Sequence, residues 1–289
     1  MNKEIIKSKI SIMNKSKITT MLLAMVMLAG SIQAQILKQE QMENKMNRIH
    51  SLSRGPQVIN VNTSLLFNDE ANKKLKDKLM ETADPNLLEG KKVALVTTDG
   101  VEEVEITFMY ELLKERGASV EVISPKAPNY PSQFAVEVPA IRETHILTVH
   151  YMENAGWMKI DKFLDEVSAE DYDAVIIPGG AWNPDALRAN TDAHKFLQDM
   201  NNQSKPIASI CHGPQVLINA GLVDGKEVTS WWSMHIDLEN AGGKVKDQPV
   251  VVDGNLITSR APIDLADFLD AVIGQLASVR VNTEINTAH

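Results

Sequence analysis

The stretch that decides the fold is Pro206-Ile207-Ala208-Ser209-Ile210-Cys211-His212-Gly213-Pro214, followed by an apolar run from Gln215 to Leu222. It predicts a short buried strand, a sharp turn and then a helix. The only cysteine of the chain, Cys211, lies on the turn. We expect such a turn to expose its central side chain and to direct the first free amides of the helix at it, which favours a thiolate. A lone cysteine is more often a small buried hydrophobic residue, but this turn favours a nucleophile.

The sequence before this turn alternates between strands and helices, as in a parallel α/β sheet. Strands are predicted at Val93–Thr97, Ser119–Ser124 and Ala174–Ile177, and helices at Val101–Arg116 and Thr191–Met200. We expect one domain with helices on both faces of a mostly parallel sheet, in which ligands bind beyond the carboxyl ends of the strands.

The remaining segments are assigned from the same patterns. Pro125–Lys162 is predicted to be irregular, with extended pieces at Phe134–Val138 and Ile146–Val149. After the cysteine turn we expect a strand at Glu227–Thr229, a helix at Ser233–Ala241, a hairpin of Val250–Val252 with Leu256–Thr258, and a closing helix at Leu265–Val279.

Residues 1–34 have the three-part pattern of a secretory signal peptide. Five lysines precede the apolar run Met21–Ala29, and Ser31–Ala34 resembles a cleavage site. The run is too short for a membrane span, so we expect an exported protein, periplasmic or secreted, with no membrane association after cleavage. Translation can start at Met1 or Met13, because the signal is complete from Met13. A buried N-terminal helix is the alternative, but it leaves the lysines unexplained.

The rest of the chain divides into three parts. Residues 35–88 are predicted to be an arm with helical patterns at Gln35–His50 and Glu70–Thr82, residues 89–279 the α/β domain, and residues 280–289 a tail. No chemistry is visible in the arm.

Charge and composition exclude several classes of function. Removal of the signal takes the formal net charge from −9 to −13, which argues against binding to nucleic acid or anionic membrane. A single cysteine allows no intramolecular disulfide. The histidines show no metal-ligand spacing and no Gly-Lys-Ser/Thr phosphate loop is present, so we expect no metal and no cofactor.

The turn Asp99-Gly100-Val101-Glu102-Glu103-Val104-Glu105 opens the first helix with three glutamates. Acids in a first helical turn stabilise the helix dipole, which is explanation enough for Glu102 and Glu103. Glu105 lies four residues after Val101, near an apolar face. A partly buried carboxyl there has a raised pKa, and its neutral form can donate a hydrogen bond to a thiolate. Glu105 is therefore the favoured site residue, with Glu102 as the alternative.

Two residues are candidates for assisting the cysteine. His212 is adjacent to it, although neighbouring side chains normally diverge, and a turn histidine bonded to backbone is the alternative. An imidazole that reaches the sulfur needs a third group to orient it, and Asp185 is the best acid for that role. A helix cap is the alternative role of Asp185.

A glycine pair and a tryptophan pair complete the candidates. Gly179-Gly180 allows close approach of backbone to a ligand, and the Gly180 and His212 amides are candidates for an oxyanion hole; a tight turn is the alternative. Trp231-Trp232 and His235 follow a predicted strand, and they are candidates for the wall of a pocket, with Trp232 as the favoured one and aromatic packing as the alternative.

Together these motifs resemble the PfpI family of the DJ-1/PfpI superfamily, which is related to class I glutamine amidotransferase domains. The similarity covers roughly Lys91 to Leu276. It rests on the glutamate-rich turn, on Tyr172–Gly180, on Ile210–Pro214, and on the downstream stretches Gly221–Lys226 and Val251–Arg260. An amidotransferase subunit is not expected, because the late His-x-Glu of those domains is missing.

The resemblance implies a flavodoxin-like three-layer sandwich, a reactive Cys211 with Glu105 as its carboxyl partner, and His212 as the base. It also implies a homo-oligomer in which an acid at the Asp185 position comes from a neighbouring subunit. The family usually has a glutamate at this position, and the aspartate side chain of Asp185 is one methylene shorter than that glutamate. Family members are described as cysteine peptidases, as glyoxalases or deglycases, and as stress-protective chaperones.

We therefore expect a cysteine-dependent enzyme that acts on an electrophilic carbonyl, in a small compound or a peptide. In the rival interpretation the protein is a non-catalytic, chaperone-like stress protein in which oxidation of Cys211 acts as a sensor.

Overall fold

The structure is a computed structural model of the chain. It describes residues 28, 30, 32–48, 69–128, 133, 136–151 and 153–287, with side chains as far as residue 277. The chain divides into two compact units, Met1–Met46 and Asn47–His289. Most of the predicted signal peptide lies outside the described residues. Residues 32–48 are helical, in the region where the sequence predicts the first helix of the arm.

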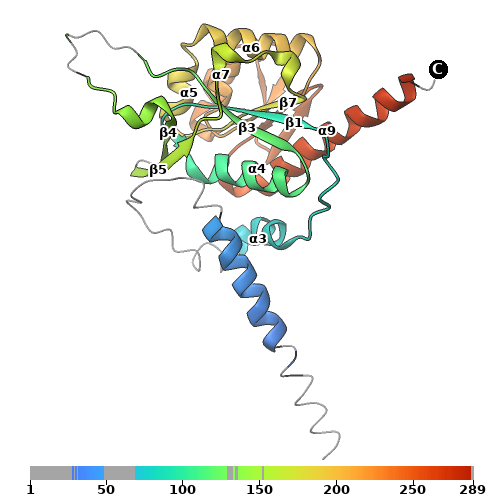
Figure 1. Ribbon diagram of the computed structural model, residues 1–289. Coiled ribbons are helices and arrows are strands. Elements are labelled where there is room, and N and C mark those ends of the chain that lie inside the picture. Colours follow the sequence, from blue (N-terminus) through green and yellow to red (C-terminus); the bar gives the residue numbers. More distant parts are fainter. Residues whose placement is uncertain are drawn as a thin grey trace, which may run out of the picture. The chain divides into compact units, whose positions relative to one another are not determined.

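A seven-stranded sheet is the centre of the second unit (Figure 1). Its order is β11-β12-β8-β7-β1-β3-β6, and every neighbouring pair is parallel except β11 with β12. The central order follows the flavodoxin-like pattern. The strands are β1 (Lys92–Val96), β3 (Ser119–Ser124), β6 (Lys162–Phe163), β7 (Ala174–Ile177), β8 (Ile207–Ile210), β11 (Val250–Asp253) and β12 (Leu256–Ser259).

Helices cover both faces of this sheet (Figure 1). One face carries α4 (Glu103–Glu115) and α9 (Leu265–Thr287); the other carries α5 (Trp182–Leu187), α6 (Thr191–Asn202) and α7 (Pro214–Asn219). The predicted three-layer α/β class is therefore confirmed. The short helix α5 was not predicted, and α9 continues eight residues beyond the predicted end at Val279.

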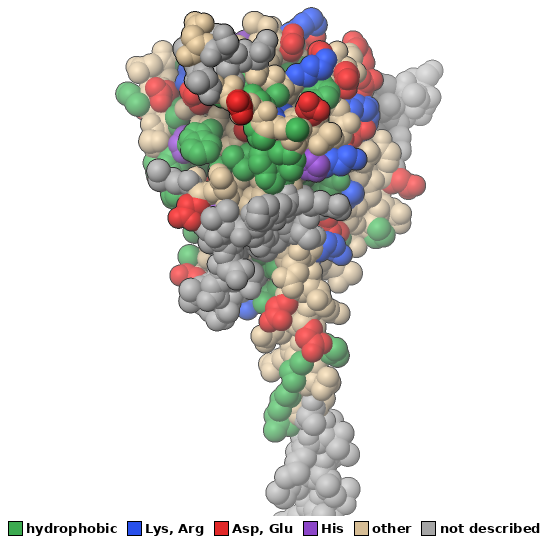
Figure 2. Space-filling model, turned by 60° about the vertical axis from the view of Figure 1, so that its left-hand side comes forward, with side chains coloured by type: hydrophobic (Ala, Val, Ile, Leu, Met, Phe, Trp, Pro, Cys, Tyr) green, Lys and Arg blue, Asp and Glu red, His purple; other side chains and the backbone are tan. Residues whose placement is uncertain are grey.

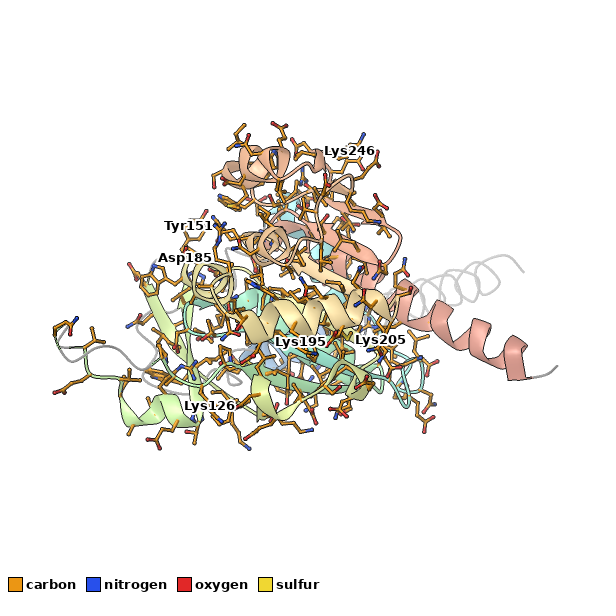
Figure 3. All side chains as sticks on the ribbon, turned by 90° about the horizontal axis from the view of Figure 1, so that it is seen from above. Lys126, Tyr151, Asp185, Lys195, Lys205 and Lys246 are labelled. Carbon is orange, nitrogen blue, oxygen red and sulfur yellow. The ribbon has the colours of Figure 1, made fainter. Side chains whose placement is uncertain are left out.

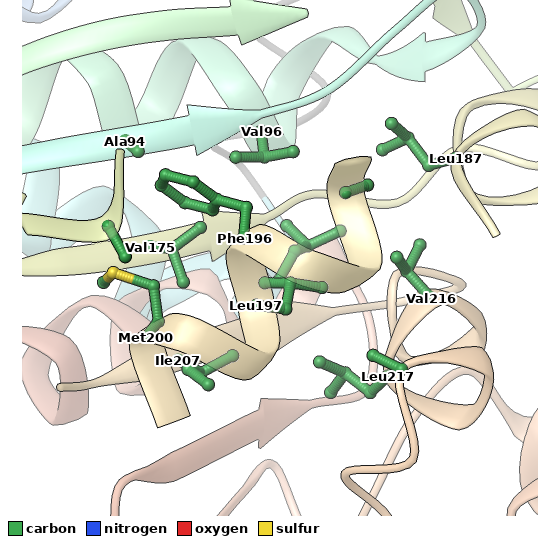
Figure 4. Close-up of a cluster of buried hydrophobic side chains, with 14 of the residues drawn as sticks. Ala94, Val96, Val175, Leu187, Phe196, Leu197, Met200, Ile207, Val216 and Leu217 are labelled. Atoms are coloured by element: carbon green, nitrogen blue, oxygen red, sulfur yellow. The ribbon is translucent and has the colours of Figure 1, made fainter. Parts of the chain in front are cut away.

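The parallel strands form because both of their faces are buried. All four residues of β7 and all four of β8 are buried, which explains why these strands are apolar without alternation. On one face, Phe196, Leu197 and Met200 of α6 pack with Val175 and Ile207 of the sheet (Figure 4). Packing of the α6 apolar face thus fixes the layer on the side of α5 and α7.

The segment predicted to be irregular contains a second, smaller sheet. Strands β4 (His145–His150) and β5 (Glu153–Lys159) form an antiparallel hairpin, and β2 (Val101–Glu102) pairs with β4. Of the three strands of this sheet, only β4 was expected, as the extended piece Ile146–Val149. Strand β5 was missed because Asn154 and Gly156 have low strand propensity, and cross-strand pairing with β4 compensates for it. Of the expected piece Phe134–Val138, the described residues 136–138 are not a strand.

The remaining elements are short and lie at the borders of the domain. They include α3 (Lys73–Met80), α8 (His235–Asn240) and the pair β9 (Glu227–Val228) with β10 (Lys244–Val245). Of these, β10 was not predicted. Among the described helices, none is both long enough and apolar enough for a membrane span.

Replacement of Phe196 by alanine tests the packing of α6 on the sheet. Phe196 is 5% exposed and its ring meets Tyr172 edge-on at 5.9 Å between centroids. We expect Phe196→Ala to lower the free energy of unfolding by about 3–5 kcal/mol, because it leaves a cavity in the core. Urea denaturation measures this change.

Lys195→Ala, on the outer face of the same helix (Figure 3), is the matched control. It removes only an exposed ion pair with Asp199, for which we expect less than about 1 kcal/mol. Similar small losses for both variants would contradict the assigned packing.

Candidate active site

The candidate nucleophile lies on a strained turn between β8 and α7. Cys211 has a φ of 61°, the left-handed region that side chains other than glycine rarely adopt. Its amide continues the sheet by donating to the Ser259 carbonyl at 3.1 Å, and its carbonyl accepts from the Trp231 amide at 2.9 Å. The turn is therefore held in this conformation by bonds on both sides.

The predicted exposure of the cysteine is wrong. Cys211 is only 6% exposed, because the loops that follow the neighbouring strands close over the turn. The expectation that the turn favours a thiolate is also wrong, because burial raises the pKa of the Cys211 thiol above its ordinary value and the nearby Glu105 carboxyl adds to the rise. Hydrogen bonds from the His212 and Gly180 amides to the sulfur lower it. Those two amides, predicted to form an oxyanion hole, therefore face the sulfur itself.

Glu105 is fully buried beside the cysteine. Its Oε2 accepts a hydrogen bond from the Gly179 amide at 2.6 Å, and the carboxyl also interacts with the Cys211 thiol. Desolvation, followed by the charge of Glu102, raises the pKa of Glu105 to about 8. The carboxyl is therefore protonated at neutral pH, as the sequence predicts, and can donate a hydrogen bond.

Glu102 is a second buried carboxyl in the same place. Its Oε2 accepts from the Tyr151 amide at 3.0 Å, and burial raises its pKa to about 7. Glu102 ends strand β2, immediately before α4 begins, so the hairpin and the first helix position it together.

His212 does reach the cysteine. Its Nδ1 lies 3.3 Å from Sγ of Cys211, and burial lowers the pKa of the imidazole, which favours the neutral form. The indole ring of Trp231 stacks on it, with 5.7 Å between centroids and 24° between planes. The Trp231 ring therefore covers one face of the His212 imidazole.

The glycine pair is required by close contacts. A Cβ on Gly179 would lie 2.6 Å from Cβ of Cys211, and one on Gly180 would lie 2.1 Å from the Gly100 carbonyl oxygen. Gly180 also has a φ of +80°. These positions let the end of β7 approach the glutamate turn and the cysteine turn simultaneously.

One pocket of about 190 Å³ brings most of the predicted residues together. Cys211, His212, Glu105, Glu102 and Gly180 all line it. Gly179 lies directly behind, in contact with Cys211 and Glu105. The pocket is at the carboxyl ends of β1, β7 and β8, where the strand order reverses and α/β sheets bind ligands.

Two predicted residues lie elsewhere. Asp185 is exposed on α5, and among the described residues no hydrogen bond or ion pair joins it to His212. Its position is set by the short helix α5, which the sequence did not reveal. Trp232 is 45% exposed outside the pocket, where the Arg260 guanidinium lies 5.5 Å from its ring centre.

The sequence analysis missed three residues that line the pocket, Ala181, Tyr151 and Pro262. Of the predicted tryptophan pair, Trp231 lines the pocket and Trp232 does not. Tyr151 comes from the unpredicted turn of the β4–β5 hairpin. The sequence shows the Trp231-Trp232 pair but not which ring lines the pocket. In the structure the Trp231 amide donates to the Cys211 carbonyl and the Trp231 ring stacks on His212.

The sequence analysis also missed Asn183, whose side chain bonds the two loops that follow β1 and β7 to each other. It is completely buried, and its Oδ1 accepts from the Thr98 amide at 2.7 Å. Its Nδ2 donates to the carbonyls of Pro178 and Gly179 at 2.8 and 3.0 Å. This side chain therefore joins the ends of β1 and β7.

Among the described residues, no group of three or more His, Cys, Asp or Glu side chains is arranged to hold a metal.

The raised pKa of Glu105 predicts a pH-dependent loss of stability. The folded protein keeps the proton up to about pH 8, whereas an ordinary glutamate releases it near 4.5. The folded state thus binds more protons between these values, and its stability falls as pH rises through this window. Glu105→Gln removes this titration, so we expect its stability relative to wild type to rise between pH 5.5 and 8.5, by up to about 1.4 kcal/mol per pH unit.

Urea denaturation at pH 5.5, 7.0 and 8.5 measures the effect. Glu239→Gln, at an exposed position on α8, is the control for loss of a surface charge. Parallel pH dependences of wild type and Glu105→Gln would contradict the assignment.

Comparisons with known proteins identify the family of this chain. Putative cysteine protease YraA of Bacillus subtilis is 39% identical over 178 residues, which are 62% of this chain and 94% of that protein. Deglycase PH1704 of Pyrococcus horikoshii is 37% identical over 60% of this chain and 92% of its own length. The crystal structure of Drosophila melanogaster DJ-1beta matches with a TM-score of 0.55 at 26% identity, over 65% of this chain and 90% of that one. The DJ-1/PfpI family profile matches residues 91–275, and the chain belongs to this family.

Proposed function

We propose that this protein is a cysteine-dependent enzyme that acts on the carbonyl group of small electrophilic compounds, in the manner of a glyoxalase or deglycase. The observation that carries the proposal is the convergence of Cys211, a neutral imidazole and a buried neutral carboxyl in one pocket. Relatives named as deglycases and as a putative cysteine protease support enzymatic activity in the family.

The arrangement provides each proton that the reaction needs. His212 Nδ1, at 3.3 Å, accepts the thiol proton, and the sulfur then attacks the carbonyl carbon. The Gly180 and His212 amides stabilise the thiolate and then the oxyanion formed beside it. Protonated Glu105 donates to the sulfur without repelling its charge, which an ionised carboxylate would do.

The size of the pocket favours a small substrate over a polypeptide. A cavity of about 190 Å³ has room for about six water volumes. A peptidase needs a groove that accepts an extended chain, and none is apparent in the described part of the pocket lining.

Turnover of methylglyoxal by purified protein tests the proposal. We expect activity in the wild type, none in Cys211→Ala, and a fall of about 10²–10⁴-fold in His212→Asn, because this variant lacks the general base. Formation of lactate measures turnover, and labelled casein serves as the peptidase substrate.

The outcomes separate the alternatives. Casein hydrolysis without methylglyoxal turnover would replace the proposal by a peptidase. No turnover of either substrate, with oxidation of Cys211 by dilute peroxide, would favour the sensor interpretation.

We also propose that the protein is exported and assembles as a homo-oligomer. The lysines and apolar run before Ala34 support export. We expect mature protein from the native cell to begin at Gln35, which N-terminal sequencing checks; a chain beginning at Met1 or Met13 would contradict cleavage.

The proposed homo-oligomer concerns Asp185. A partner subunit would have to bring Asp185 to the site, because no hydrogen bond or ion pair joins Asp185 to His212 within the described chain.

A further inference from the structure

The described lining of the pocket contains acids but no basic cation. Glu102 and Glu105 are its ionisable acids, and none of the described residues that line it is lysine or arginine. A negatively charged substrate would therefore lie close to Glu102, whose carboxyl is partly ionised near neutral pH, with no cation in the described lining to compensate its charge. An uncharged substrate meets no such repulsion.

The opposite wall of the pocket is aromatic. Tyr151 and Trp231 meet edge-on, with 6.3 Å between ring centroids, and Pro262 lies beside them in the lining. Hydrophobic side chains also gather on one face of the second unit (Figure 2). Tyr151 itself is 67% exposed, so its ring is accessible to a ligand. Aromatic walls favour ligands that offer a ring or another apolar group.

This wall is held in place by its neighbours. The Trp231 amide donates to the Cys211 carbonyl, and Trp232 meets the Trp231 ring edge-on at 5.1 Å. The Tyr151 amide donates to Glu102, so the hairpin turn is attached to the pocket as well. The Trp231 ring, which packs against His212 and Trp232 before binding, loses little conformational entropy when a ligand packs against it.

The volume matches a ring with a short reactive group. An apolar cavity of about 150 Å³ binds benzene. The present pocket, at about 190 Å³, has room for a benzene-sized ring and a few more atoms, whereas a three-carbon dicarbonyl would leave much of the aromatic wall without contact.

We propose that the pocket selects uncharged α-oxoaldehydes that carry an aromatic or bulky apolar substituent, with the aldehyde at Cys211 and the substituent against Trp231 and Tyr151. This rests on the proposed carbonyl chemistry. The Cys211 sulfur bonds to the aldehyde carbon, and His212, which accepts the thiol proton, delivers it to the carbonyl oxygen. A proton then leaves the former aldehyde carbon and one is delivered to the adjacent carbon, while the hydroxyl proton passes from the first oxygen to the oxygen of the adjacent carbon. The first carbon is thereby oxidised to a thioester and the second is reduced to an alcohol. One water cleaves the thioester, and the products are a 2-hydroxy acid and the free thiol.

The specificity constants for four substrates test the proposal. Phenylglyoxal and methylglyoxal differ in the ring, and 4-methylphenylglyoxal and 4-carboxyphenylglyoxal have similar size but differ in charge. We expect kcat/KM for phenylglyoxal to exceed that for methylglyoxal by about tenfold or more, and 4-carboxyphenylglyoxal to be poorer than 4-methylphenylglyoxal by at least about tenfold. Liquid chromatography of the 2-hydroxy acids measures each rate.

The substrates differ in their intrinsic chemical reactivity, but this difference is the same for wild type and variants. A change in the ratio of two specificity constants between wild type and a variant therefore reports on the pocket. Trp231→Leu is expected to reduce the phenylglyoxal-to-methylglyoxal ratio by about 3–10-fold. Glu102→Gln is expected to reduce the discrimination against the carboxylated substrate. Trp157→Leu, on β5 and in the lining of a different cavity, is the matched control and should keep the wild-type ratios. Thermal denaturation checks that each variant is folded.

Failure of the two proposals gives different results. Wild-type turnover of none of the four dicarbonyls would overturn the carbonyl chemistry and the selectivity with it. Turnover in which methylglyoxal is at least as good as phenylglyoxal, or in which Trp231→Leu leaves the ratio unchanged in a folded protein, would overturn the selectivity alone.

Discussion

The site depends on one buried contact, the interaction of the Glu105 carboxyl with the Gly179 amide and the Cys211 thiol. It joins the first turn of α4 to the ends of β7 and β8. A carboxylate would be unstable in this position, because burial and the neighbouring Glu102 both disfavour its charge. The proton on Glu105 therefore makes a completely buried carboxyl compatible with the fold, and the same proton makes it a hydrogen-bond donor to the sulfur.

Backbone geometry brings these groups close enough to interact. Cys211 adopts a left-handed conformation, and the neighbouring turn places Gly179 and Gly180 where any side chain would collide with Cys211 or Gly100. Asn183 connects the same turn to the end of β1 through three hydrogen bonds. Strain at the cysteine is thus sustained by contacts from three strand ends, which also shield the sulfur from solvent.

The second wall of the pocket comes from parts of the chain that are distant in sequence. Trp231 follows β9 and Tyr151 is at the tip of the β4–β5 hairpin, yet both are linked by backbone amides to site residues. Partial burial, to which the stacked Trp231 ring contributes, lowers the pKa of the His212 imidazole and keeps it available as a base. Acidic groups on one side and aromatic rings on the other give this pocket a chemical character that the cysteine turn alone does not have.

The sequence by itself determined the α/β class, the strand before Cys211 and the positions of the main helices, because fully buried strands and amphipathic helices leave strong local patterns. It also selected Cys211, Glu105, His212 and the glycine pair, since their spacing relative to strand ends is local. Only the tertiary structure decided that Cys211 is buried, that Trp231 lines the pocket while Trp232 does not, and that Asp185 is not in the described pocket lining. It also revealed Tyr151 and Asn183. These properties depend on which loops close over the strand ends and on single hydrogen bonds between distant segments, and local sequence does not encode either.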